Sequence, residues 1–144
     1  MADKTKELKA SISLVNEKLN FRGSAEGNDP VSIDYFPPLG DNLGYTSLEL
    51  LLLSLSSCVG SSVLTFLRRM NRHISSFEIY ATGTRREEHP LGFRLIRLEI
   101  KLGSPDATAA DLEKVISLSE EKYCPVYSMI KGNCEVIISY VINT

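Results

Sequence analysis

TSLELLLLSLSSCVGSSVLTFLRRMNR, residues 46–72, predicts one long helix around which the rest of the chain is organised. Thr46 and Glu49 have the spacing of a capping box, in which each side chain accepts a hydrogen bond from the backbone amide of the other residue. At about 1.5 Å per residue this helix would be roughly 40 Å long, comparable to the diameter of a whole domain. Leucines surround its first half, so we expect a central helix that is buried on several sides.

A belt of small residues follows these leucines and would allow another backbone to approach closely. We expect a second helix to pack there, either from the same chain or from a twin subunit. Glu49 and Cys58 are nine positions apart, and at about 100° per position they point to opposite sides of one unbroken helix. If helices from two subunits cross at the belt, Glu49 of one chain approaches Cys58 of the other, and a monomer in sedimentation would contradict this. The belt consists of Ser54, Ser56, Ser57, Gly60, Ser61 and Ser62.

Alternating apolar residues on both sides of the long helix predict strands. Three short antiparallel strands are expected between Lys9 and Tyr35, before a loop over residues 36–44 that is rich in proline and glycine. After the helix we expect a hairpin of Phe77–Thr84 and Phe93–Leu102, a helix from about Thr108 to Tyr123, a short helix Val126–Ile130 and a last strand Val136–Ile142. The order βββ-α-ββ-αα-β predicts an α+β fold with helices packed on antiparallel sheets.

Length and composition fit one globular unit. The chain has 144 residues and a mass of 16.0 kDa, so we expect a single domain over residues 1–144. A net charge of -2 gives no indication of a positively charged surface that would bind nucleic acid or an acidic membrane. The longest apolar run, Leu50–Leu55, is far below the roughly 20 residues of a membrane span. The charged N-terminus lacks the apolar core of a secretory signal, so we expect a cytoplasmic location.

The chemistry available to this chain resides in lone thiols. Cys58, Cys124 and Cys134 are odd in number and widely spaced, which argues against a disulfide framework and against a zinc site. Cys58 lies mid-helix and Cys134 on an apolar strand face, where buried filler is the common role of cysteine. Cys124 precedes Pro125, so we expect it at a helix N-cap, where the helix dipole would lower its thiol pKa.

Two motifs resemble the family of osmotically inducible protein C and organic hydroperoxide resistance proteins. TSLELLLLSLSSC at residues 46–58 is similar to the family's acidic residue and central-helix cysteine, and EKYCPV at residues 121–126 is similar to its second-cysteine motif. The predicted order of elements agrees over nearly the whole chain. RREEHP at residues 85–90 resembles a less studied branch of that family.

The resemblance implies an intertwined homodimer with active sites near the subunit interface. It implies that Cys58 is the peroxidatic thiol, Cys124 the resolving thiol and Glu49 the acidic partner of an activating arginine. Arg22, on an early strand, is the arginine available for that role, although it can equally be an ordinary surface arginine. The implied activity is the reduction of organic hydroperoxides in the oxidative stress response. It needs no metal or organic cofactor, only an external dithiol, which is lipoyl-linked in related proteins.

Two other interpretations remain open at this point. The chain can be a non-catalytic dimer of the same fold that binds a hydrophobic small molecule or senses redox state. Alternatively, Cys58 and Cys124 can be inert core residues of a structural protein. Titration of the thiols with a small electrophile separates activated cysteines from buried ones.

Overall fold

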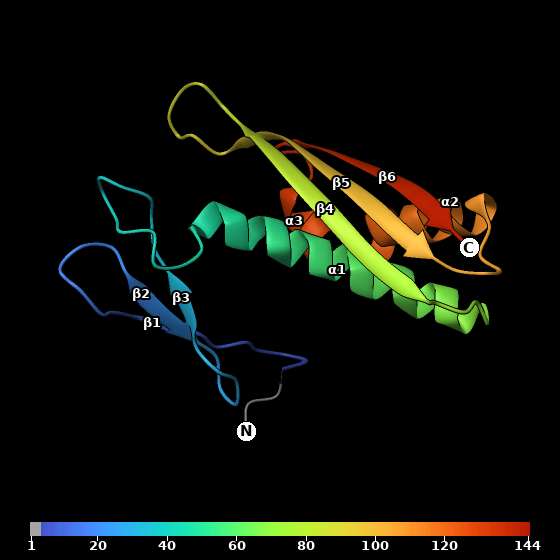
Figure 1. Cartoon of the computed structure of the whole chain (residues 1–144), viewed down its shortest axis with the longest axis horizontal. Helices are drawn as coiled ribbons and strands as arrows, with labels where there is room; N and C mark the ends of the chain where they lie inside the picture. The colour runs from blue at the N-terminus through green and yellow to red at the C-terminus, as the bar shows by residue number, and fades with distance from the viewer. Residues whose placement is uncertain (1–3) are drawn as a thin grey trace. The chain divides into compact units, whose positions relative to one another are not determined.

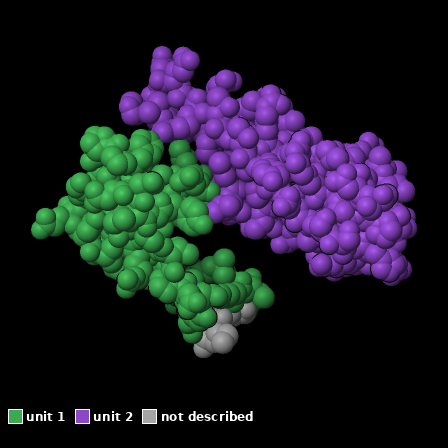
Figure 2. Space-filling model, in the orientation of Figure 1, with its two compact units in different colours: residues 1–50 green, residues 51–144 purple. Residues whose placement is uncertain are grey.

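The computed structural model describes residues 4–144, which form two compact units (Figure 1). One unit ends at Leu50 and the other comprises Leu51–Thr144 (Figure 2). The α+β class and the predicted order of elements are confirmed. The expectation of a single domain stays a prediction.

The first unit contains a three-stranded antiparallel sheet, as predicted. Its strands are β1 (Ser11–Leu14), β2 (Phe21–Ser24) and β3 (Val31–Ile33), in the order β1-β2-β3. The register places Ile12 and Leu14 on an apolar face with residues 21, 31 and 33, whereas Arg22 shares the opposite face with serines. Ile12 is 62% exposed and Leu14 54%, so this chain leaves much of the apolar face uncovered.

Asp34 organises the loop that follows this sheet. Its carboxylate accepts hydrogen bonds from the backbone amides of Tyr35, Asp41 and Leu43. Burial alone would raise the pKa of Asp34, but these amides outweigh it and hold the pKa below its ordinary value. Because one carboxylate binds three backbone amides, the proline-rich loop has a defined conformation without the regular hydrogen bonds of a β-sheet.

Helix α1 (Ser47–Arg69) begins with the predicted capping box. The Thr46 amide donates to Glu49 Oε1 at 2.8 Å, and the Glu49 amide donates to Thr46 Oγ1 at 3.2 Å. The helix ends three residues earlier than predicted, because Asn71 takes a left-handed conformation with φ 62°. The amides of residues 71 and 72 then donate back to the carbonyls of residues 68 and 67, which closes the helix as a Schellman motif.

The second unit contains a mixed sheet of β4 (Ser76–Arg85), β5 (Phe93–Gly103) and β6 (Glu135–Asn143). The predicted β4–β5 hairpin is confirmed, with antiparallel pairing over almost its full length. The prediction of purely antiparallel sheets is wrong for β6, which pairs with β5 in parallel. The helices between these two strands supply the long crossover connection that a parallel pair requires.

Three consecutive helical segments form this crossover. Helix α2 (Ala109–Leu118) begins at the capping residue Thr108, and α3 (Pro125–Ile130) begins directly after Cys124. Between them η1 (Ser119–Tyr123) is a π-helical turn, wider than an α-helical one. The predicted break near Tyr123 is therefore confirmed, and the π-helical turn precedes it.

One side of α1 packs against the β4-β5-β6 sheet (Figure 1). A Cβ placed on Gly60 would lie 3.1 Å from the ring of Phe77 on β4, so part of the small-residue belt serves packing against a strand within the chain rather than against a helix. The buried stripe of α1 is narrow, since Leu51 is 36% exposed and Leu53 52% exposed. The expectation of burial on several sides is thus not met within this chain. The buried residues of α1 are Leu55, Val59, Gly60, Val63 and Leu67.

Helix α1 is also long and apolar enough to cross a membrane. Its most apolar 18-residue window has a mean hydropathy of 2.0, because serine and glycine weigh little against the leucines. The longest uninterrupted apolar run, Leu50–Leu55, does not reveal this property, because serine and glycine interrupt the apolar residues of the helix. A single helix of this kind is weak evidence for a membrane span, since the core helix of a soluble protein passes the same test.

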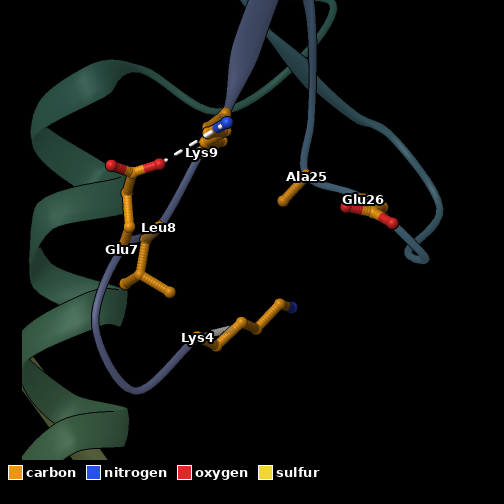
Figure 3. A pocket seen from close by; sticks show the side chains of 7 residues that line it. Lys4, Glu7, Leu8, Lys9, Ala25 and Glu26 are labelled. Atoms are coloured by element: carbon orange, nitrogen blue, oxygen red, sulfur yellow. Dashed lines mark ion pairs between the residues drawn. The ribbon is translucent and has the colours of Figure 1, made fainter. Parts of the chain in front are cut away.

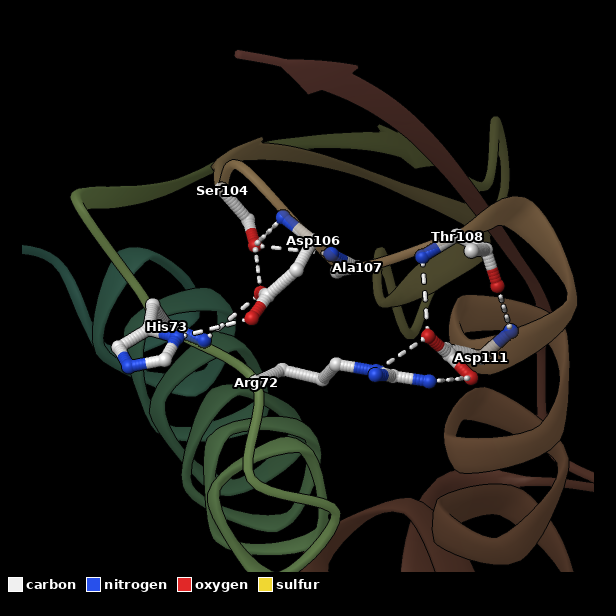
Figure 4. A network of polar contacts seen from close by, with 7 residues as sticks. All are labelled: Arg72, His73, Ser104, Asp106, Ala107, Thr108 and Asp111. Atoms are coloured by element: carbon white, nitrogen blue, oxygen red, sulfur yellow. Dashed lines mark hydrogen bonds and ion pairs between the residues drawn. The ribbon is translucent and has the colours of Figure 1, made fainter.

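A polar network joins the end of α1 to the start of α2 (Figure 4). Arg72 Nε donates to Asp111 Oδ2 at 2.8 Å, and His73 Nδ1 lies 2.8 Å from Asp106 Oδ2. The side-chain hydrogen bond from His73 holds the pKa of Asp106 at about 2. Asp111 also completes the capping box with Thr108. The network fixes where α2 starts, and thereby the path that leads to Cys124.

Candidate functional site

The structure brings Cys58 and Cys124 together, although they come from different helices. Cys58 is half-buried in the middle of α1, and Cys124 is the N-cap residue of α3 with only 2% of its surface exposed. The Cys58 thiol is one of the groups that raise the pKa of Cys124, so the two side chains lie near each other. Both cysteines are free thiols. Two free thiols near each other are candidates for a bond between their sulfur atoms.

The environment of Cys124 differs from the prediction in one respect. The N-cap position is confirmed, and the amide of Tyr127 donates to the sulfur at 3.3 Å. The expected lowering of its pKa is wrong, since burial and then the neighbouring Cys58 thiol raise the pKa of Cys124 to about 11. Desolvation of a thiolate outweighs the two backbone amides that favour it. Cys124 is therefore a protonated thiol near neutral pH.

The π-helical turn and one buried serine position Cys124. The Cys124 amide donates to the carbonyl of Ser119 at 3.0 Å, which closes the wide turn. The hydroxyl of Ser119 is hydrogen-bonded to the hydroxyl of Ser62 at 2.7 Å and to the carbonyl of Val115 at 2.9 Å. Ser62 lies one turn beyond Cys58 on α1, so the contact between the two serines sets the register of the two cysteine-bearing elements.

A groove of about 380 Å³ opens beside Cys58. The rings of Phe66 and Tyr123 pack against each other in its wall, with centroids 4.8 Å apart. Cys124 is buried and does not line the groove, so a small molecule in the groove meets Cys58 rather than Cys124. The groove is lined by Cys58, Ser61, Ser62, Thr65, Phe66, Arg69, Tyr123 and Pro125.

Glu49 and Arg22, the other two predicted site residues, belong to the unit that ends at Leu50. Glu49 is exposed and accepts from the Thr46 amide in the capping box. Arg22 is exposed on the polar face of β2. Within residues 4–50 the structure shows no ion pair between Glu49 and Arg22. Their assignment as the acidic and cationic partners of the thiol stays a prediction.

The remaining thiol, Cys134, lies just before β6. It is half-buried and packs against the core. Burial raises the pKa of its thiol, and the nearby Arg86 opposes that shift in part. These features match its predicted place in or at the edge of the core. Across residues 4–144 the structure contains no cluster of three or more His, Cys, Asp or Glu side chains suited to a metal ion.

A second hollow, of about 320 Å³, lies in the first unit (Figure 3). Lys4, Glu7, Lys9 and Glu26 line it together with Leu8 and two alanines. The charges balance, and Lys9 pairs with Glu7 at 3.4 Å while both side chains remain mostly exposed. Such a pair contributes little binding energy, so this hollow offers no chemistry comparable to the cysteine pair.

Comparison with known protein families identifies the family of this chain. The family described as OsmC-like protein matches residues 40–139. The chain belongs to the OsmC-like family. It is 27% identical over 124 residues to Protein YhfA of Escherichia coli K12, which covers 86% of this chain and 90% of YhfA. The matched residues include Glu49, Cys58 and Cys124, so the assignment agrees with the two motifs from which the resemblance was inferred.

Solved structures of this OsmC-like fold superpose over nearly the whole chain. A hypothetical protein from Aquifex aeolicus VF5 has a TM-score of 0.83 and 27% identity, and covers 95% of this chain and 96% of its own. The organic hydroperoxide resistance protein OhrB of Bacillus subtilis has a TM-score of 0.66 and 15% identity, covering 95% of this chain and 99% of its own. The likeness to OhrB shows the shared fold. The names of YhfA and of the Aquifex protein state no activity.

Proposed function

We propose that this OsmC-like protein is a thiol-dependent peroxidase that reduces organic hydroperoxides. The proposal rests on one observation, the proximity of Cys58, a thiol that lines a groove, to the buried thiol of Cys124. Family membership supports it, since proteins that share this fold include organic hydroperoxide resistance proteins. The aromatic wall of the groove favours an organic substituent on the peroxide.

In the first step the Cys58 thiolate attacks the terminal oxygen of the hydroperoxide. An S–O bond forms, the O–O bond breaks, and the departing alkoxide takes a proton to become an alcohol. Cys58 is oxidised to a sulfenic acid while the hydroperoxide is reduced. Cys124 does not compete for the substrate, because burial and its raised pKa keep it protonated and away from the groove.

In the second step Cys124 resolves the sulfenic acid. Its sulfur attacks the Cys58 sulfur, the hydroxyl leaves with the Cys124 proton as water, and a disulfide forms. This bond needs Cα atoms about 4.4 to 6.8 Å apart. An external dithiol then reduces the disulfide by thiol–disulfide exchange and is itself oxidised to a disulfide. The protein returns to its starting state without a metal or an organic cofactor.

We further propose that the working form is a homodimer in the cytoplasm. Leu53 on α1 and Ile12 and Leu14 on the first sheet are each more than half exposed, and apolar surface of this kind favours cover by another protein surface. A second copy of the chain supplies matching surfaces. In such a dimer Glu49 and Arg22 are the pair that we expect to act on the Cys58 thiolate.

Stopped-flow kinetics with cumene hydroperoxide test the activity. Reduced wild-type protein is expected to consume one equivalent of hydroperoxide per chain and to release the alcohol, whereas Cys58→Ser consumes none. Cys134→Ser is the matched control and keeps the wild-type rate, because Cys134 lies outside the pair. Equal inertness of wild type and Cys58→Ser would overturn the peroxidase proposal.

A further inference from the structure

We infer that Ser62 is a further catalytic residue, whose hydroxyl oxygen accepts a hydrogen bond from the O–H group that passes from the hydroperoxide to the Cys58 sulfur. This inference rests on the proposed function and adds a residue to its first step. Two observations carry it. Ser62 lines the groove beside Cys58, and the proton of its hydroxyl is used on the side away from the groove, by Ser119.

Ser62 lies one helical turn after Cys58, on the same side of α1. Residues four apart on a helix have Cβ atoms about 5 to 6 Å from each other, and helical side chains lean toward the N-terminus. The half-buried side chain of Ser62 therefore leans toward Cys58, and both residues line the groove. A small molecule whose oxygen contacts the Cys58 sulfur can thus reach the Ser62 hydroxyl as well.

The proton of the Ser62 hydroxyl is directed to Ser119. Ser119 Oγ lies 2.7 Å from Ser62 Oγ and 2.9 Å from the carbonyl oxygen of Val115. A hydroxyl has one proton and a carbonyl oxygen can only accept, so both contacts are hydrogen bonds only if Ser119 donates to Val115 and accepts from Ser62. Ser119 is only 1% exposed, and this arrangement gives its buried hydroxyl both a donor and an acceptor partner.

Other serines of α1 use their hydroxyls differently. Ser56 and Ser57 each donate to a carbonyl three or four residues earlier in the same helix, at 2.7 and 3.1 Å, as serines in helices commonly do. Within residues 4–144 the hydroxyl of Ser62 has no such bond to its own helix, because its partner is Ser119. Ser62 therefore offers the groove the lone pairs of its oxygen, which makes it a hydrogen-bond acceptor there and not a donor.

An acceptor at this place distinguishes the two oxygen atoms of a hydroperoxide. The terminal oxygen carries the proton and the other is bonded to carbon, so only the terminal O–H can donate to Ser62. This hydrogen bond holds the terminal oxygen beside the Cys58 sulfur. The sulfur supplies the electron pair of the new S–O bond, the O–O bond breaks, and the alkoxide takes a proton from water. The O–H bond stays intact, so the Cys58 sulfenic acid keeps the hydrogen bond to Ser62.

The rate of sulfenic acid formation in a Cys124→Ser background tests this role, because resolution by Cys124 is removed there. The Cys58 sulfenic acid formed with cumene hydroperoxide is trapped with dimedone and measured by mass spectrometry. We expect Ser62→Ala to slow its formation about fivefold, the factor that corresponds to one neutral hydrogen bond of about 1 kcal/mol. Ser62→Thr keeps the hydroxyl and should retain most of the rate. Ser57→Ala, next to Cys58 but outside the groove, should not change it.

A thiol reagent without O–H or N–H groups separates this role from a structural one. Methyl methanethiosulfonate reacts with the same Cys58 thiolate but cannot donate to Ser62, so Ser62→Ala should leave that rate unchanged. Ser119→Ala removes the same hydrogen bond between the serines but keeps the Ser62 oxygen, so it should slow the hydroperoxide reaction less than Ser62→Ala. Equal losses in these two variants, or toward both reagents, would overturn the inference. A Cys124→Ser parent that consumes no hydroperoxide would overturn the proposed function itself.

Discussion

The reactivity of Cys124 toward alkylating agents is expected to be low until the pH is well above neutral. Its pKa is raised from 9.0 to about 11, so at pH 8 about one molecule in a thousand carries the thiolate. A thiol with the ordinary value would be ionised in about one molecule in ten. Iodoacetamide is therefore expected to modify Cys124 about a hundred times more slowly than an ordinary thiol, and burial slows the reaction further.

Trypsin digestion makes this rate measurable without removing any cysteine. Cleavage after lysine and arginine places Cys58, Cys124 and Cys134 in three different peptides, so mass spectrometry follows each of them in the same sample. We expect the Cys58 peptide to be labelled first, because Cys58 opens on the groove. The labelling rate of Cys124 should continue to rise with pH beyond 9.

The Cys58→Ser variant tests the cause of the shift. The Cys58 thiol is the second contribution to the raised pKa of Cys124, after burial, so its removal should lower that pKa and speed the labelling of Cys124 at pH 8. Cys134→Ser should leave the rate unchanged. A Cys124 rate that levels off below pH 9 in the wild type would refute the reasoning, since Cys124 would then be the activated thiol.

We expect three further variants to change oxidation, disulfide formation or stability through the contacts described for Cys124, Ser119 and Asp106. Cys124→Ser should complete one turnover and then suffer further oxidation of Cys58 to the sulfinic acid, seen as added oxygen in the mass of its peptide; sustained turnover with a dithiol would contradict this. Ser119→Ala loses the hydrogen bond to Ser62, worth about 1 kcal/mol, so the equilibrium constant for forming the Cys58–Cys124 disulfide against glutathione should fall about fivefold. The control Ser117→Ala, at an exposed position, should leave this constant unchanged. The hydrogen bond from His73 lowers the pKa of Asp106 to about 2, so the stability that this contact adds is complete above about pH 4 and is lost as the pH falls toward 2. In urea titrations Asp106→Asn should be less stable than wild type at neutral pH and should lose less stability in acid. If the stabilities of the two proteins change in parallel with pH, the contact does not stabilise the fold.

Local signals in the sequence were sufficient for most of the fold. The Thr46 and Glu49 pattern gave the start of α1, and Pro125 gave both the helix break and the N-cap position of Cys124. Alternating apolar residues located the strands, but alternation is the same in parallel and antiparallel pairs, so the direction of β6 could not be obtained from it. The end of α1 depended on Asn71, whose tolerance of left-handed geometry is a weak signal.

The sequence was sufficient to predict which cysteines belong to the candidate site, but not the pKa of Cys124. The two cysteine motifs identified Cys58 and Cys124, but the pKa of Cys124 depends on burial by distant segments, which a helix-dipole argument omits. Sequence reasoning also missed the hydrogen bond between Ser62 and Ser119, because these residues are 57 positions apart in the chain and no local pattern links them.

Mapping the disulfide formed in a single turnover tests the central claim most directly. Reduced protein is mixed with one equivalent of cumene hydroperoxide, remaining thiols are blocked in acid, and the tryptic peptides are identified without reduction. We expect one linked pair that joins the peptides of Cys58 and Cys124, formed in proportion to the alcohol released, with Cys134 left free. A bond from Cys58 to Cys134 or to another chain, or alcohol released without the Cys58–Cys124 bond, would contradict the account.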